Sequence, residues 1–179
     1  LGELYLEEKD FVSGLSALRQ AVTFFPNNVE TRVVSKRMIN EFSSIYTDGT
    51  ADSMTPLTAL SMYDQFRELT PVGRRGDRII QRLADRLVEV DLLDRASVLL
   101  DRQVKFRLRG KQKAIVGSKL ALIRLLDRQP RLALDALNES VSPGLDSRLA
   151  LERKRLRSRS VFELGAVSYT HLTLPTKPF

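Results

Sequence analysis

The chain has 179 residues, a net charge of +7 and no cysteine. Its length suits one domain or one repeat array, and the missing cysteine excludes disulfides, thiol nucleophiles and zinc–thiolate sites. No apolar run approaches the roughly 20 residues of a membrane span, so we expect a soluble protein, with no compartment indicated.

Residues 1–26 carry the clearest motif. The chain begins inside this motif and without Met, so we expect a fragment of a longer protein. Its residues are Leu1-Gly2, Tyr5, Gly14, Leu18, Ala21 and Pro26. Gly14 permits close contact between two helices, and Pro26 cannot continue the second helix. These residues have the spacing of a tetratricopeptide unit, and the chain resembles a tetratricopeptide-repeat protein.

The sequence predicts an irregular pair of helices in residues 27–72. Asn27-Asn28 offers an N-cap for a helix to about residue 46, and the polar segment 47–55 is a loop. Thr55-Pro56 starts a second helix, which stops at Thr70-Pro71. Gly73-Arg-Arg-Gly76 then predicts a linker turn. The apolar stripe expected on the first helix consists of Val29, Val33, Met38, Phe42 and Ile45.

A 37-residue period covers the region 77–165. The equivalent positions are Leu83-Ala84 and Leu120-Ala121, Leu87 and Arg124, Ala96 and Ala133, and Leu100 and Leu137. A fixed period of this length with two amphipathic stretches is typical of an α-solenoid. We therefore expect an all-α fold, a right-handed α-solenoid of antiparallel helix pairs. The expected helices are 77–91, 94–109, 111–127, 130–141 and 147–164, with a helix-to-turn junction at Leu164-Gly165.

Residues 166–179 have neither the period nor the charge density of the preceding sequence. They resemble a translated sequencing-adapter read-through of the kind seen at the ends of metagenomic reading frames. We expect this tail to be non-native or disordered, and it contains the sole histidine, His171. The read-through is also the only reason to expect a bacterial source.

Catalytic and metal-binding patterns are weak. With no cysteine and with His171 in the tail, no Ser-His or Cys-His pair is predicted. We therefore expect neither an enzyme nor a cofactor. Segment 48–52 lacks the alternating oxygen ligands and the closing Glu of a calcium loop, so a capped turn is favoured over a metal site. Segment 73–76 lacks the strands that surround a nucleic-acid clamp loop, which favours a linker.

The tetratricopeptide resemblance implies that the first helix of each unit lines a groove that binds peptides or helices of partner proteins. The positions that it places in this groove are Arg78, Gln81, Asp85, Ser118, Leu122, Arg155 and Arg159. Leu122 and Leu125 are favoured instead as inter-repeat core. The resulting functional prediction is a non-catalytic scaffold for protein–protein interaction, and the positive charge favours an acidic partner.

Two basic clusters, 102–113 and 148–159, support an alternative function, the binding of an acidic polymer such as RNA or DNA. The candidate anion-binding residues are Lys105, Arg107, Arg109, Lys111, Arg153, Lys154 and Arg157. The same pattern is explained by a solvated helix face with cations near helix C-termini, and this explanation is favoured over an anion-binding role. Only Phe106 and Phe162 are available for stacking in these regions, which weakens a single-strand nucleic-acid function.

Overall fold

The computed structural model describes residues 1–26 and 28–170, and every regular element in this part is a helix. The chain forms two compact units, Leu1–Arg86 and Leu87–Phe179. The first unit contains α1 (Gly2–Glu7), α2 (Phe11–Phe24), α3 (Val29–Thr47), the 3-10 helix η1 (Thr50–Ser53), α4 (Pro56–Gln65), the 3-10 helix η2 (Arg67–Leu69) and most of α5 (Arg74–Glu89). The second contains α6 (Leu93–Phe106), α7 (Gly110–Leu126), α8 (Pro130–Glu139) and α9 (Ser147–Thr170).

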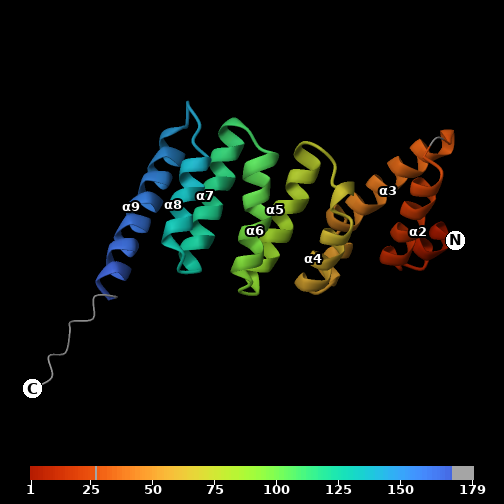
Figure 1. The fold of residues 1–179 in the computed structure, drawn as a ribbon, viewed down its shortest axis with the longest axis horizontal. Helices are drawn as coiled ribbons and strands as arrows, with labels where there is room; N and C mark the ends of the chain where they lie inside the picture. The colour runs from red at the N-terminus through yellow and green to blue at the C-terminus, as the bar shows by residue number, and fades with distance from the viewer. Residues whose placement is uncertain (27, 171–179) are drawn as a thin grey trace, which may run out of the picture. The chain divides into compact units, whose positions relative to one another are not determined.

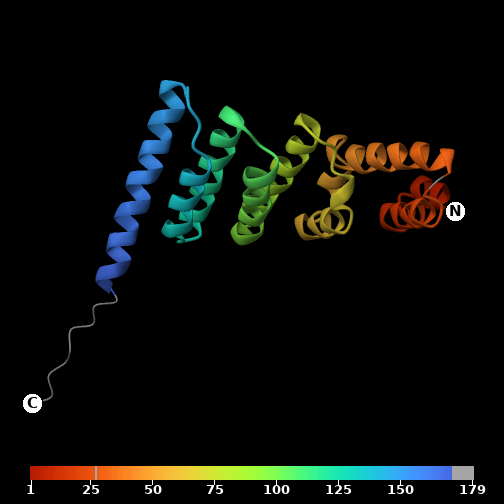
Figure 2. The same ribbon diagram turned by 45° about the horizontal axis from the view of Figure 1, so that its top comes forward.

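The α1–α2 contact depends on two glycines. A Cβ on Gly14 would lie 2.7 Å from the Leu6 side chain, and a Cβ on Gly2 would lie 2.9 Å from Leu18. Real Cβ atoms do not approach other atoms so closely, so a side chain at either position would have to displace a packed leucine. The predicted role of Gly14 in close helix contact is confirmed. Helix α3 then lies alongside α2 (Figure 2).

Helices α3 and α4 begin where their capping residues predict. The Asn28 side chain accepts a hydrogen bond from the Glu30 N–H at 3.1 Å, and the Thr55 hydroxyl accepts one from the Thr58 N–H at 3.2 Å. Pro56 occupies the first turn of α4, where its missing N–H costs nothing. Both predicted helix starts are confirmed. Helix α4 nevertheless ends at Gln65, earlier than predicted, and η2 follows it.

Three aromatic rings form the core between α3 and α4. The ring centroids of Phe42 and Tyr46 are 5.1 Å apart, and Tyr63 lies 6.2 Å from each of them. The Tyr46 hydroxyl donates a hydrogen bond to the Ala59 carbonyl at 2.8 Å, so its polar end is satisfied inside this core. Val33 does not belong to the buried stripe, since its side chain is 67% exposed.

The predicted linker at 73–76 is wrong, because α5 begins at Arg74. Only Gly73 adopts a turn conformation, with φ of +77°, and its carbonyl accepts the Asp77 N–H at 3.1 Å. Left-handed φ favours glycine here, whereas Gly76 is a buried residue within the helix. Gly76 is therefore helical despite its low helix propensity.

In the second unit, α6 to α9 follow one another side by side (Figure 1). The apolar positions of the 37-residue period are all buried, including those at the end of the first unit. They are Leu83, Ala84, Leu87, Ala96, Leu100, Leu120, Ala121, Ala133 and Leu137. The period therefore marks core positions.

One turn conformation occurs three times, at Lys9, Asp91 and Arg128. These residues have φ of 62°, 60° and 55°, and each N–H donates to the carbonyl three residues earlier. The next N–H reaches back five residues in every case, at 2.9, 2.9 and 2.7 Å. This paired pattern is the Schellman arrangement. A small buried residue follows each turn at the same distance, namely Gly14, Ala96 or Ala133.

Helix α9 continues to Thr170, so no turn occurs at Gly165. A single exposed glycine costs a helix only about 1 kcal/mol relative to alanine, which is too little to end it. Residues 171–179 of the predicted tail, including His171, lie outside the described residues. In the part that the structure describes, no helix is both long and apolar enough to span a membrane. The sequence-based division into 1–26, 27–72, 77–165 and 166–179 stays a prediction.

Candidate interaction surfaces

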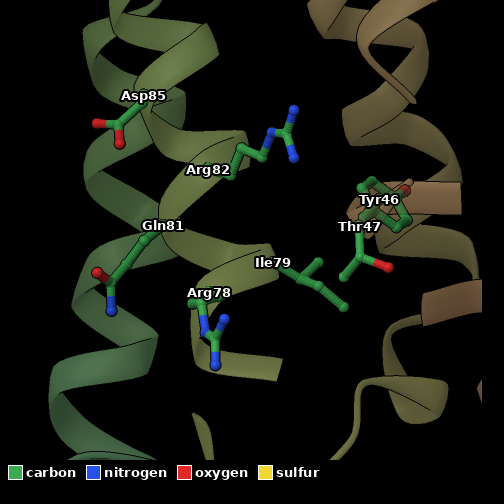
Figure 3. Close-up of a pocket in the computed structure, with 7 residues that line it drawn as sticks. All are labelled: Tyr46, Thr47, Arg78, Ile79, Gln81, Arg82 and Asp85. Carbon is green, nitrogen blue, oxygen red and sulfur yellow. The ribbon is translucent and has the colours of Figure 1, made fainter. Parts of the chain in front are cut away.

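The first unit contains a hollow of ≈ 370 Å³ between α3 and α5, which we call the α3–α5 pocket (Figure 3). Its lining residues are Tyr46, Thr47, Arg78, Ile79, Gln81, Arg82 and Asp85. Three of them, Arg78, Gln81 and Asp85, were predicted from the sequence as partner-binding positions. In Figure 3, Ile79 and Arg82 point toward Tyr46 and Thr47, whereas Gln81 and Asp85 lie on the opposite side of α5.

Arginines of α5 fix the pocket to the loop after α3. The Arg86 guanidinium donates to the Ala51 carbonyl at 2.7 Å and to the Met54 carbonyl at 2.6 Å. Arg82 forms an ion pair with Asp52. The carboxylate of Asp52 in the segment 48–52 is therefore bound by arginine. These contacts hold the pocket wall in place before any ligand arrives.

The pocket combines an apolar wall with polar groups. Ile79 and the Tyr46 ring are buried, and burial raises the pKa of Tyr46 far above its usual range, so its hydroxyl stays neutral. Arg78 is exposed and has no carboxylate within ion-pair distance in the described part of the chain. A hollow with buried apolar side chains at its base and the exposed Arg78 cation at its edge is suited to a peptide side chain together with a carbonyl or carboxylate.

The other predicted groove positions lie in the second unit, and the structure changes the interpretation of several. Ser118 is buried, and its hydroxyl donates to the Ala114 carbonyl at 2.9 Å, so it is not a surface residue. Leu122 is 40% exposed and not core, while Leu125 is buried as predicted. Arg155 is exposed. Arg159 is exposed and pairs with Glu163 at 2.7 Å.

Much of the basic cluster 102–113 is neutralised within the protein. Lys105 lies 2.8 Å from Asp101 and 3.8 Å from Glu139, and the hydrogen bond to Asp101 raises the pKa of Lys105. Lys111 lies 2.8 Å from Asp146. Both lysines therefore already have acidic partners, which weakens their assignment as anion-binding residues.

The two arginines of this cluster differ from the lysines. The Arg109 guanidinium donates to the Leu108 carbonyl at 3.1 Å, and Arg107 is half-buried. Arg109 is nevertheless exposed, so of these two arginines only Arg107 is partly withdrawn from the surface.

Arg153, also predicted to bind anions, is instead 9% exposed and bound inside the protein. Its guanidinium donates to the carbonyls of Ala114 at 2.8 Å and Leu137 at 2.6 Å. It also donates to the hydroxyls of Ser118 and Ser140, at 3.1 and 3.2 Å. Arg153 therefore ties α9 to α7 and α8. Burial and the nearby charge of Arg157 lower the pKa of Arg153.

The close contact beside Arg153 depends on residues that the sequence did not single out. A Cβ on Gly117 would lie 2.0 Å from the Ser140 Oγ. Glycine inside α7 therefore permits the Ser140 side chain to reach Arg153. The only sequence signal is a glycine within an otherwise regular helical pattern, which often marks close packing.

A second hollow of ≈ 300 Å³ lies between α9 and the loop that follows α8, and we call it the α8–α9 pocket. Its lining residues are Val141, Ser142, Leu145, Ala150, Arg153, Lys154 and Arg157. Lys154 and Arg157 are exposed, and neither has a carboxylate within ion-pair distance among the described residues. Of the predicted anion-binding positions, the structure thus brings Arg153, Lys154 and Arg157 together here.

No protein-family model, curated protein or solved structure matches this chain. Within residues 1–26 and 28–170, no group of three or more acidic or histidine side chains is arranged to hold a metal ion.

Proposed function

We propose that the protein is a non-catalytic scaffold that binds a peptide or helix of a partner protein. The observation that carries this proposal is the α3–α5 pocket, in which Arg78, Gln81 and Asp85 line one hollow beside buried apolar side chains. Pockets with an apolar wall and a few fixed polar groups are the usual form of a ligand site.

We further propose that the helices form a right-handed α-solenoid of antiparallel, tetratricopeptide-like pairs. The shared turn at Lys9, Asp91 and Arg128 supports repeated units, because its hydrogen bonds and the small residue that follows it are equivalent at all three places. In such repeats, stability comes from contacts between neighbours, which leaves continuous surfaces for partner binding.

The pocket suggests how a peptide would be held. A partner side chain would enter the hollow above Ile79 and the Tyr46 ring, while Arg78 would donate a hydrogen bond to a nearby carbonyl or carboxylate. Because arginine contacts fix the pocket wall, little ordering is needed on binding.

Affinity capture from lysate of the source cells, with the full chain as bait, tests this proposal. The pocket variant is Arg78→Ala with Gln81→Ala, and the matched control is Arg131→Ala with Gln112→Ala, two exposed positions of the second unit. We expect the wild type and the control to retain one defined protein through nuclease and moderate salt, and the pocket variant to lose it. Recovery that disappears with nuclease, or that the pocket variant retains, would contradict the proposal.

A further inference from the structure

The α8–α9 pocket concentrates positive charge beside an apolar surface. Arg153, Lys154 and Arg157 stand three, four and seven residues after Ala150, so all four share one side of α9. Val141 and Leu145 of the preceding loop form the apolar wall.

The charge in this pocket is not neutralised by the described residues. The four groups that accept hydrogen bonds from Arg153 are carbonyls and hydroxyls, which satisfy its N–H groups but carry no negative charge. Asp146, in the loop beside the pocket, is paired with Lys111 and also accepts the Leu149 N–H at 2.9 Å. Lys154 and Arg157 therefore present their charges at the pocket with the Arg153 charge behind them.

We propose that the α8–α9 pocket binds an acidic side chain of a partner peptide, with an adjacent apolar residue of that peptide against Val141 and Leu145. The carboxylate would lie between Lys154 and Arg157, each donating a charge-assisted hydrogen bond. This inference rests on the proposed scaffold function and names the chemistry of a second contact, in the other unit of the chain.

A peptide carboxylate fits the pocket better than the backbone of a nucleic acid. A phosphate polymer needs a row of exposed cations along its path, but Lys105 and Lys111 are already paired with carboxylates. The lining also contains no aromatic ring on which a base could stack. A single acidic group beside an apolar residue fits an open surface hollow of ≈ 300 Å³.

The pocket is held in its binding form by the packing beneath it. Arg153 is anchored to α7 and α8 by hydrogen bonds, and the contact of Gly117 with Ser140 fixes the residue that follows α8. A preformed site loses little conformational entropy on binding, which favours affinity for a short peptide.

Fluorescence anisotropy with the full chain tests the inference. The probe is the labelled peptide Ala-Leu-Glu-Glu-Leu-Ala with its C-terminus amidated, and the comparison peptide carries Gln in place of both Glu residues. The pocket variant is Lys154→Gln with Arg157→Gln. The matched control is Arg131→Gln with Arg148→Gln, which removes the same charge from exposed positions outside the pocket.

We expect the Glu peptide to bind the wild type and the control within about twofold of each other, and the pocket variant about tenfold more weakly. The Gln peptide should bind the wild type at least about tenfold more weakly than the Glu peptide. The inference is overturned by absent binding of the Glu peptide, equal binding of the Gln peptide, or equal losses in both variants.

A short oligothymidylate serves as the nucleic-acid probe. The peptide proposal is overturned if oligothymidylate binds the wild type more tightly than the Glu peptide does and if this binding is lost in the Lys154→Gln, Arg157→Gln variant. The ligand of the pocket would then be a phosphate polymer. If the α8–α9 pocket does not bind the Glu peptide, the result of the capture experiment with the Arg78 and Gln81 variant is unchanged. Failure of this inference can therefore be distinguished from failure of the scaffold function.

Discussion

Gly117 of α7 packs directly against Ser140, at the end of α8, so that a Cβ on Gly117 would lie 2.0 Å from the Ser140 Oγ and 2.2 Å from its Cβ. This contact brings the Ser140 hydroxyl within 3.2 Å of the Arg153 guanidinium of α9. Three helices of the second unit therefore meet at one small set of buried side chains, of which Arg153 also lines the α8–α9 pocket.

Gly117→Ala should destabilise the protein by about 2 kcal/mol, because the new methyl group would force α7 and α8 apart and overpacking outweighs the gain in helix propensity. Urea unfolding measures the change. Ser140→Gly in the same chain should restore part of the loss, since it removes both clashing atoms.

Gly165→Ala is the matched control, because a Cβ at Gly165 would meet nothing within 4 Å. This substitution should stabilise the protein by up to about 1 kcal/mol. Equal effects of the two alanine substitutions would show that Gly117 has no packing role.

Arg153→Met should cost about 2–3 kcal/mol, because it leaves the Leu137 carbonyl and the neighbouring serine hydroxyls without their charged donor. Arg155→Met changes an exposed arginine of the same helix and should alter stability by less than about 0.5 kcal/mol. Thermal unfolding of both variants makes the comparison. A small loss for Arg153→Met would mean that water replaces its hydrogen bonds.

Glycine at Lys9, Asp91 or Arg128 should stabilise the protein by about 0.5–1 kcal/mol at each position, because their left-handed conformation disfavours side chains. Arg102→Gly, at an exposed position inside α6, should have the opposite effect, with a loss of about 1 kcal/mol. Urea midpoints of the four variants give the signs. If glycine stabilises the protein at one of the three turn positions and destabilises it at another, the three turns are not structurally equivalent.

The Lys111–Asp146 pair should contribute stability only above acidic pH. The hydrogen bond from Lys111 lowers the pKa of Asp146 below its ordinary value of 3.8. A lowered carboxyl pKa stabilises the folded state above that ordinary value and loses this effect as the pH falls through the folded pKa. Asp146→Asn should therefore be less stable than the wild type near neutral pH, with a difference that disappears as the pH falls through the lowered pKa of Asp146.

Lys111→Gln removes the partner of the same ion pair and should give the same loss at neutral pH. The double variant should lose little more than either single variant, since only one interaction is removed. A difference between Asp146→Asn and the wild type that persists at low pH would assign the effect to the asparagine itself.

Local sequence signals predicted the helices well. Capping by Asn28 and Thr55 and the 37-residue period located helix starts and buried positions, because both depend on residues close in sequence. The turn at Gly73 was predicted too long, since the buried environment of Gly76 is not visible in local propensity.

Long-range contacts could not be predicted from the sequence. Arg153 and Ser118 are 35 positions apart, and the predicted surface role of each was wrong because the two side chains are hydrogen-bonded inside the protein. Counting cations likewise did not show that Lys111 has an acidic partner, since Asp146 is brought to it by folding. The nearest partner of Lys105, Asp101, is four residues away on the same helix and is a local pairing. Arg78, Gln81 and Asp85 were predicted from the repeat spacing and the tetratricopeptide resemblance. All three line the α3–α5 pocket, and their partner-binding role stays a prediction.

Site-specific photo-crosslinking tests the scaffold function most directly. A photoreactive residue placed at Arg78, in the α3–α5 pocket, is compared in source-cell lysate with the same residue at Arg131, an exposed position of α8. We predict a nuclease-resistant adduct to one protein from position 78 and none from position 131. Adducts to nucleic acid, or the same adducts from both positions, would contradict a peptide-binding scaffold.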